Sequence, residues 1–253
     1  MVNNWCIYPL LVADQQRHID QSEKLLSSIQ PGDAPILYWN VAVPCGLVLG
    51  FSQRAAIVNQ VALEKCALPV YQRRAGGTAV LVGPHLLSLD VVLPAGHPLI
   101  LHDIVESYRW FGEAWMATLE QLGISTRLVS PTEAHTLRDR LKQPETADNE
   151  RLISRACYGT LSSYEVVVGQ RKVVGFDMIR RRSGSLLQAG VLLHWETDML
   201  ALLLGHTPAE QQFLREALHE RAVGIDVLAR RVITTDEIML AFNRTISQIT
   251  LIA

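Results

Sequence analysis

The sequence lacks the features that mark several classes of protein. Its 253 residues include 23 basic and 25 acidic side chains, a net charge of −2, so it has no basic footprint of the kind that nucleic-acid binding needs. Residues 1–11 have no basic start and contain Asn3, Asn4 and Pro9, which does not fit a signal peptide. The longest apolar runs, such as 199–205, are far shorter than the roughly 20 residues that cross a membrane. We therefore expect a cytoplasmic protein with neither nucleic acid nor a membrane as a partner.

Cysteine is scarce, and the four present are Cys6, Cys45, Cys66 and Cys157. They show neither the CxxC spacing of a zinc site nor the density of a disulfide scaffold, so we expect no metal site and a reducing compartment. The first three stand among apolar neighbours and are expected to be buried thiols. Cys157 precedes a small, polar stretch at 158–163 and is expected to be accessible.

Apolar periodicity predicts an α+β fold, in the broad α/β class, with a mixed, largely antiparallel sheet flanked by helices. Short runs rich in Val, Ile and Leu, bounded by Pro, Gly or Asn, predict strands at 36–40, 47–50, 78–82, 86–93, 161–168 and 186–194. Helical spacing of apolar residues predicts a helix over 102–122, ended by Gly123. Thr207 and Thr234 each begin a capping-box pattern, which predicts two further helices in a helical C-terminal part at 197–253. We expect one domain over residues 1–253.

Residues 135–151 are polar and charged and contain Pro144, a composition that predicts a mobile loop inside this domain. Beyond it, Gly169 and Gln170 stand between two β-rich arms, the pattern of a two-residue hairpin. This hairpin places Lys172 on a strand.

The segment Arg73-Arg74-Ala75-Gly76-Gly77-Thr78 precedes a predicted strand and is suited to binding an anion or an acyl group. Glycine lets backbone N–H groups approach a ligand closely, and arginine supplies fixed planar donors. The same letters also fit an ordinary tight turn with solvated arginines.

Two further side chains are candidates for chemistry. Lys172 lies between apolar residues, so it either meets an anion or a polar substrate atom, or lies on an edge strand and reaches water. Cys157 becomes a reactive nucleophile if a cation lies near it, and is a structural residue otherwise. No Cys/His/Asn order can be established, and His135 and His194 are no more than candidates for a histidine base.

Taken together, the motifs resemble one family, the superfamily of lipoate–protein ligase A, biotin protein ligase and octanoyltransferase. The resemblance covers about residues 37–193 and rests on several motifs in order. These are Leu37-Tyr38-Trp39, Val48-Leu49-Gly50-Phe51-Ser52-Gln53, Leu68-Pro69-Val70-Tyr71-Gln72-Arg73-Arg74-Ala75-Gly76-Gly77-Thr78-Ala79-Val80, Ala156-Cys157-Tyr158, Tyr164-Glu165-Val166 and Gly169-Gln170-Arg171-Lys172-Val173-Val174-Gly175.

The resemblance implies an acyl pocket along the Arg-Gly-Gly strand, with Lys172 against the acyl carbonyl and Cys157 in the place of the nucleophile of cysteine-type octanoyltransferases and lipoyl amidotransferases. It implies ping-pong transfer of an octanoyl or lipoyl group through a Cys157 thioester, with no resident cofactor. The implied donor is acyl carrier protein or the glycine-cleavage H protein, and the implied acceptors are lipoyl domains of 2-oxoacid dehydrogenases or the H protein. The substrate-binding residues that it implies are Arg73, Arg74, Gly76, Gly77, Thr78 and Gly175.

Three positions depart from the family pattern. Val82 stands where a histidine is common, Phe176 follows Gly175 in place of a small residue, and Ala189 stands where the family often has histidine. These changes weaken the alternative of an ATP-dependent lipoate–protein ligase, which would need ATP and Mg²⁺. They also leave open a divergent substrate or a non-catalytic acyl-binding protein.

Overall fold

The computed structural model describes residues 5–249. Its strands are β1 (Cys6–Ala13), β2 (Ile36–Ala42), β3 (Gly46–Leu49), β4 (Val70–Gln72), β5 (Val80–Val82), β6 (Leu86–Pro94), β7 (Arg127–Leu128), β8 (Val166–Val168), β9 (Arg171–Arg180) and β10 (Gly184–Leu192). Its α-helices are α1 (Gln15–Ser28), α2 (Gln60–Cys66), α3 (Arg109–Gln121), α4 (Pro131–Asp139), α5 (Ala147–Ile153), α6 (Thr197–Leu204), α7 (Pro208–Arg221), α8 (Ile225–Leu228) and α9 (Thr235–Gln248).

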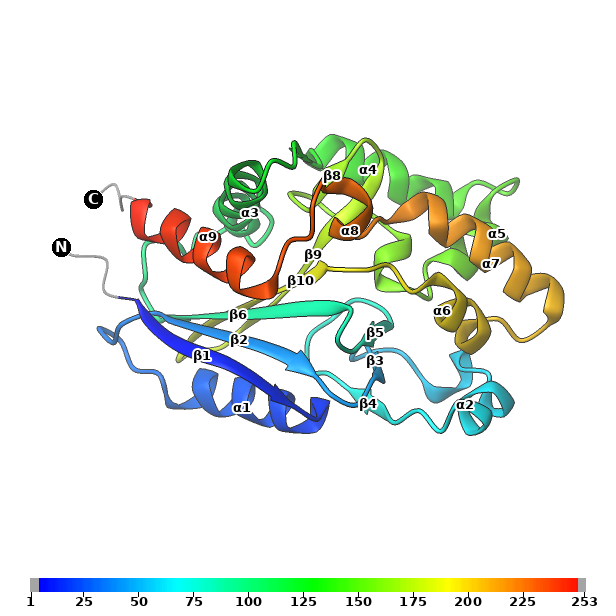
Figure 1. The fold of residues 1–253 in the computed structure, drawn as a ribbon, viewed down its shortest axis with the longest axis horizontal. Coiled ribbons are helices and arrows are strands. Elements are labelled where there is room, and N and C mark those ends of the chain that lie inside the picture. The colour runs from blue at the N-terminus through cyan, green and yellow to red at the C-terminus, as the bar shows by residue number, and fades with distance from the viewer. Residues whose placement is uncertain (1–4, 250–253) are drawn as a thin grey trace.

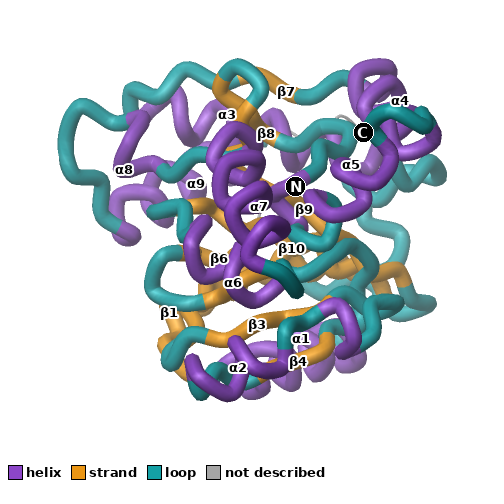
Figure 2. The backbone as a smooth tube through the Cα atoms, turned by 90° about the vertical axis from the view of Figure 1, so that its right-hand side faces the viewer, coloured by secondary structure: helices purple, strands orange, loops and turns teal. Residues whose placement is uncertain are grey.

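A seven-stranded sheet runs through the molecule in the order β1-β2-β6-β10-β9-β8-β7 (Figure 1). Only the β1–β2 pair is parallel, and the other five pairs are antiparallel. A small second sheet, β4-β3-β5, lies beside it at the end that carries α2, α6 and α7. Figure 2 looks onto this end and shows α6 and α7 together in front of the strands. The predicted mixed, largely antiparallel sheet with flanking helices is confirmed.

Helices cover both faces of the large sheet, α1 on one and α3 with α9 on the other (Figure 1). Because side chains alternate along a strand, each strand divides its residues between the two faces. On β2, Trp39 packs edge-on against Trp115 of α3 and Phe242 of α9, with ring centroids 6.0 and 5.6 Å away. Tyr38 points to the other face and packs with Leu26 of α1.

The two predicted N-caps are confirmed, and the full capping box is formed at Thr234, whereas the Glu210 carboxylate accepts from the His206 N–H instead of the Thr207 N–H. The side chains of Thr207 and Thr234 accept hydrogen bonds from the backbone N–H groups at the starts of α7 and α9. Gly123 follows α3 with a φ of 81°. The helix predicted over 102–122 begins later, at residue 109, because the Asp103 carboxylate accepts hydrogen bonds from the next backbone N–H groups and forms a turn there.

The prediction of a loop over residues 135–151 is wrong. The segment carries most of α4, a short 3₁₀ turn (Arg140–Lys142) and α5, and Pro144 lies between the two helices. Most of the charged residues that suggested a loop line the solvent side, while Ala147, Ile153 and the charged Glu150 are buried. Glu150 also accepts a 2.7 Å hydrogen bond from Arg221 of α7. The amino-acid composition of this segment does not show that one side of its helices is buried.

The hairpin prediction is confirmed, since β8 and β9 are joined by two residues and Gly169 has a φ of 62°. The expectation of buried thiols at the first three cysteines is wrong: Cys6 is exposed on the edge strand β1, and Cys45 and Cys66 are only partly buried. Across residues 5–249, no helix has the length and apolar character that a membrane span requires.

Candidate active site

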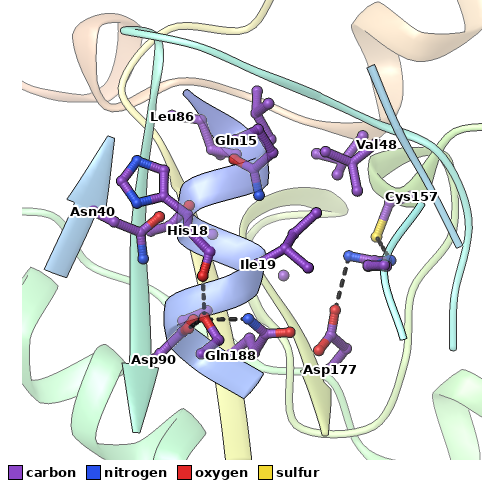
Figure 3. Close-up of a pocket in the computed structure, with 18 of the residues that line it drawn as sticks. Gln15, His18, Ile19, Asn40, Val48, Leu86, Asp90, Cys157, Asp177 and Gln188 are labelled. Atoms are coloured by element: carbon purple, nitrogen blue, oxygen red, sulfur yellow. Dashed lines mark hydrogen bonds and ion pairs between the residues drawn. The ribbon is translucent and has the colours of Figure 1, made fainter. Parts of the chain in front are cut away.

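A cavity of about 820 Å³, including its open mouth, lies between α1, the face of the large sheet that α1 covers, and the small sheet (Figure 3). Its wall is apolar on the side of β3, β5 and the start of β6, where Val48, Val80, Val82 and Leu86 line it. Cys157 lines the same cavity. A cleft with a few polar groups in an apolar wall suits a small ligand or an acyl chain.

Cys157 reaches the cavity because its segment pairs with the residues after the glycines. Ala79 and Ala156 form a parallel bridge, the Ala79 N–H donates to the carbonyl of Arg155 over 2.9 Å, and the Cys157 N–H donates to the carbonyl of Ala79 over 2.7 Å. Two motifs far apart in the sequence are thereby joined by backbone hydrogen bonds.

The charged side chain of Arg73 lies beside the Cys157 sulfur. Its Nη2 lies 3.9 Å from Sγ, and its Nη1 lies 2.8 Å from Oδ2 of Asp177. It also donates to the carbonyls of Gly76, over 3.1 Å, and Thr78, over 3.2 Å. Burial lowers the pKa of Arg73, but attraction to Asp177 and Cys157 outweighs it, so this pKa lies above its ordinary value. A permanently charged guanidinium is thus fixed beside the sulfur.

The predicted substrate-binding residues form two groups, those that line the cavity and those that do not. Arg73, Arg74 and Gly175 line the cavity, although the Arg74 side chain is 68% exposed and lies 3.9 Å from Glu23. Gly76, Gly77 and Thr78 do not line it and instead form the turn that holds Arg73.

Gly77 is required in this turn for two reasons. Its φ is 83°, and an added Cβ would lie 2.6 Å from Nη2 of Arg73. Gly76 differs, since a Cβ there would meet nothing within 4 Å. The conformational freedom of glycine is therefore used at position 77.

Lys172 is buried, and Glu165 is its charged partner. Its Nζ donates over 2.8 Å to Oε1 of Glu165 and over 2.9 Å to the backbone carbonyl of Cys157, and lies 5.3 Å from the centre of the Tyr158 ring. Burial raises the pKa of Glu165, and the attraction of Lys172 opposes that rise. Lys172 does not line the cavity here, so its contact with an acyl carbonyl stays a prediction, while its hold on the Cys157 backbone is direct.

Tyr158 closes one side of the site. Its hydroxyl donates to the carbonyl of Gly190 over 2.6 Å, and an added Cβ at Gly190 would lie 2.6 Å from that hydroxyl. Tyr158 therefore packs against the backbone of β10 at Gly190, which has no side chain. This contact positions the neighbouring Cys157.

Several polar residues of the cavity were not singled out from the sequence. Asp90 of β6 and Gln188 of β10 lie opposite each other in register, and Gln188 lies opposite Asp177 of β9. Asp90 accepts hydrogen bonds from Gln188 and from Ser22 of α1. Burial raises the pKa of Asp90 to about 7 against the opposing effect of these two donors. Nothing in the local sequence pointed to the pairing of Asp177 with Arg73.

The histidine candidates lie outside the site. His135 is exposed on α4 and His194 is exposed beside Asp226, and neither lines the cavity. The departures Val82, Phe176 and Ala189 all line it, so each changes the surface that a ligand meets. Within residues 5–249 no group of three or more His, Cys, Asp or Glu side chains is placed to hold a metal ion.

Comparison with known proteins places the chain in a family. Residues 14–247 match the family model described as the lipoyl protein ligase A/B catalytic domain. The octanoyltransferase LipM of Anoxybacillus flavithermus is 30% identical over 209 residues, which cover 81% of this chain and 70% of that protein. The octanoyltransferase LipM of Exiguobacterium sibiricum is 26% identical over 245 residues, covering 96% of this chain and 85% of that protein.

Solved structures agree on the fold. A bi-partite lipoate protein ligase from Thermoplasma acidophilum superposes with a TM-score of 0.75 at 20% identity, covering 97% of this chain and 82% of that one. A lipoate-protein ligase A bound with ATP superposes with a TM-score of 0.71, also at 20% identity, covering 98% and 85%. The chain therefore belongs to the lipoyl protein ligase A/B catalytic domain family.

Proposed function

We propose that this protein is an acyltransferase that moves an octanoyl or lipoyl group through a thioester on Cys157. The observation that carries the proposal is the position of Cys157 in the cavity, with the Arg73 guanidinium 3.9 Å from its sulfur. Similarity to octanoyltransferases over most of the chain supports it.

The transfer has two balanced steps. The Cys157 thiolate attacks the carbonyl carbon of an acyl thioester, the thiolate of the carrier leaves, and the acyl group is held on the enzyme. The amine of an acceptor lysine then attacks this thioester, the Cys157 thiolate leaves, and the nitrogen releases a proton to give an amide.

Arg73 and Lys172 have separate parts in this proposal. Arg73 stabilises negative charge at the sulfur, because it is fixed by Asp177 and keeps its charge at any working pH. Lys172 is a positioning residue in the conformation described, since it holds the backbone carbonyl of Cys157. In the acyl-bound state we expect Lys172 to contact the acyl carbonyl. We expect Gly76, Gly77 and Thr78 to contact the substrate in the same state.

The proposed carriers and acceptors follow from the reaction. The donor is acyl carrier protein or the H protein, and the acceptor is a lipoyl domain or the H protein. The structural relative from Thermoplasma acidophilum is described together with its E2 lipoyl domain, which supports a protein acceptor of this kind. No resident cofactor is needed, since the thioester already carries the activated acyl group.

The test is an intact-mass spectrum of the protein after mixing with octanoyl-acyl carrier protein in the absence of ATP. We expect one added octanoyl mass, removable by hydroxylamine and absent in Cys157→Ser. Cys66→Ser is the matched control, because Cys66 is partly buried but does not line the cavity, and it keeps the adduct. A folded protein that stays unmodified with octanoyl and lipoyl donors contradicts the proposal.

A parallel reaction with free lipoate, ATP and Mg²⁺ separates the ligase alternative. Formation of lipoyl-adenylate by the wild type and by Cys157→Ser would make the protein a ligase. We expect none.

A further inference from the structure

The lining of the cavity changes from apolar to polar with distance from Cys157. Cys157 packs against an apolar cluster whose members Val48, Val80, Val82, Leu86 and Tyr158 also line the cavity. In Figure 3, Cys157 and Val48 lie on one side of the cavity, and Asn40 lies on the other. An acyl chain that starts at Cys157 and crosses the cavity therefore leaves apolar surroundings and approaches polar ones.

The strand registers show how the sheet produces this change. One row of residues crosses β9, β10, β6 and β2 as Gly175, Gly190, Ser88 and Asn40. The two glycines have no side chain, and the Tyr158 ring and hydroxyl fill the space above them. Ser88 and Asn40 present polar side chains to the cavity instead. The row thus changes from an aromatic surface to polar groups between β10 and β6.

The polar side chains of Ser88 and Asn40 are not tied up by the fold. Neither side chain makes a hydrogen bond to any other of residues 5–249, and their polar atoms stay open to solvent in the cavity. In the adjacent row, by contrast, Asp90 is bonded to Gln188 and to Ser22 of α1. Water can serve Ser88 and Asn40, so a hydrocarbon chain that covers them removes hydrogen bonds and replaces none.

The distances match a chain of eight carbons. A Cβ added at Gly175 would lie 3.4 Å from the Tyr158 ring, so Gly175 marks the end of the row near Cys157. From there Ser88 is two strand spacings away, about 10 Å, and Asn40 is three, about 14 Å. With bonds of about 1.5 Å in a staggered chain, an octanoyl group extends about 9 Å and a decanoyl group about 11 Å. Octanoyl ends before Ser88, and decanoyl passes it.

From this arrangement we infer that Ser88 and Asn40 set an upper limit of about eight carbons on the acyl chain that the cavity accepts. Each methylene up to this length moves from water to apolar lining, whereas further methylenes displace water from the two polar side chains. The limit is one of polarity and not of space, because the cavity continues past Ser88 to Asn40. A lipoyl group has the same eight-carbon backbone and is accepted as well. The inference rests on the proposed function in that Cys157 holds the acyl carbonyl.

The experiment measures the binding of three unreactive ligands, N-methylhexanamide, N-methyloctanamide and N-methyldecanamide, by titration calorimetry. For the wild type we expect binding on the order of tenfold tighter from six carbons to eight, the effect of two buried methylene groups, and no gain from eight to ten. Asn40→Leu with Ser88→Ala keeps the shapes of the side chains and removes their polarity. In this double variant the ten-carbon amide should bind on the order of tenfold more tightly than to the wild type.

Asn149→Leu is the matched control. It replaces the same kind of side chain at an exposed position on α5 that does not line the cavity, so it should keep the wild-type series. A wild type that gains as much from eight to ten carbons as from six to eight overturns the inference. So does a double variant with a cooperative urea transition that still gains nothing from ten carbons, because space would then end the cavity. The wild-type series decides alone if the double variant does not fold.

Loading of Cys157 by hexanoyl-, octanoyl- and decanoyl-acyl carrier protein, followed by intact mass, separates this inference from the proposed function. A limit at eight carbons in the amide series without any loading of Cys157 keeps the limit and removes the proposed acyl transfer. Equal loading rates with octanoyl and decanoyl donors keep the acyl transfer and overturn the limit.

Discussion

The buried pair of Lys172 and Glu165 offers a sharp test of how this site is held together. Lys172→Met removes the ammonium and keeps a side chain of similar length. Glu165 then stays in the core, 2% exposed, with two backbone N–H donors, from Ser162 over 2.6 Å and Phe176 over 3.3 Å. The Cys157 carbonyl loses its 2.9 Å hydrogen bond.

The size of the effect follows from the geometry. Two unit charges 2.8 Å apart attract by about 6 kcal/mol at an effective dielectric constant of 20. Not all of this is lost, because the carboxyl group can take up a proton and keeps its backbone donors. Breaking a buried pair by removing one partner costs about 3–5 kcal/mol, and we expect Lys172→Met to lose that much stability near pH 8.

The loss should depend on pH, with a defined sign. Burial already raises the pKa of Glu165 above its ordinary value of 4.5, and removing Lys172 takes away the charge that opposes this rise. Between its unfolded and folded pKa values, the folded variant binds more protons at Glu165 than the unfolded chain does, so stability falls as pH rises. Below the pKa that Glu165 has in the unfolded chain, its carboxyl group is protonated in both the folded and the unfolded state. The loss of stability that depends on its ionisation then disappears.

Urea denaturation followed by tryptophan fluorescence at pH 5 and pH 8 measures the effect. Lys172→Met with Glu165→Gln removes both charges and should recover most of the stability lost at pH 8. Lys142→Met is the matched control, since Lys142 is 74% exposed, and should leave the midpoint unchanged at both values of pH. The reasoning is refuted if Lys172→Met is as stable as the wild type at pH 8. It is also refuted if Lys172→Met is destabilised equally at pH 5 and pH 8.

Three further predictions concern the turn of the site and a helix cap. Arg73→Met should slow acyl transfer on the order of 100-fold, because it removes the cation beside the sulfur, whereas the exposed Arg74→Met should change the single-turnover rate little. Gly77→Ala should lower stability by about 1 kcal/mol or more and slow transfer, while Gly76→Ala, which has open space, should leave stability unchanged; urea midpoints of the two variants and the transfer rate of Gly77→Ala decide. Thr207→Ala removes the N-cap of α7 and should cost about 1 kcal/mol of stability without altering acyl loading, and an unchanged midpoint would contradict the capping role.

The sequence by itself determined the local elements and the family. Strands 36–40 and 86–93, the hairpin at Gly169 and the caps at Thr207 and Thr234 were all found where short-range patterns predicted them. Periodicity, turn residues and caps act over a few residues, so a single sequence exposes them. The ordered motifs added the family and pointed to Cys157 and the Arg-Gly-Gly segment.

Only the tertiary structure decided which groups meet. Arg73 and Cys157 are 84 residues apart, and they meet because a parallel bridge pairs the segments that contain them. Asp177 reaches Arg73 through the position of β9 in the sheet, which no local pattern fixes. The helices over 135–151 were missed for the same reason, since their few apolar residues are buried by contacts with distant elements such as α7. Register and packing depend on the whole chain, so residues that look alike in sequence, such as Arg73 and Arg74, end in a partly buried ion pair and in solvent.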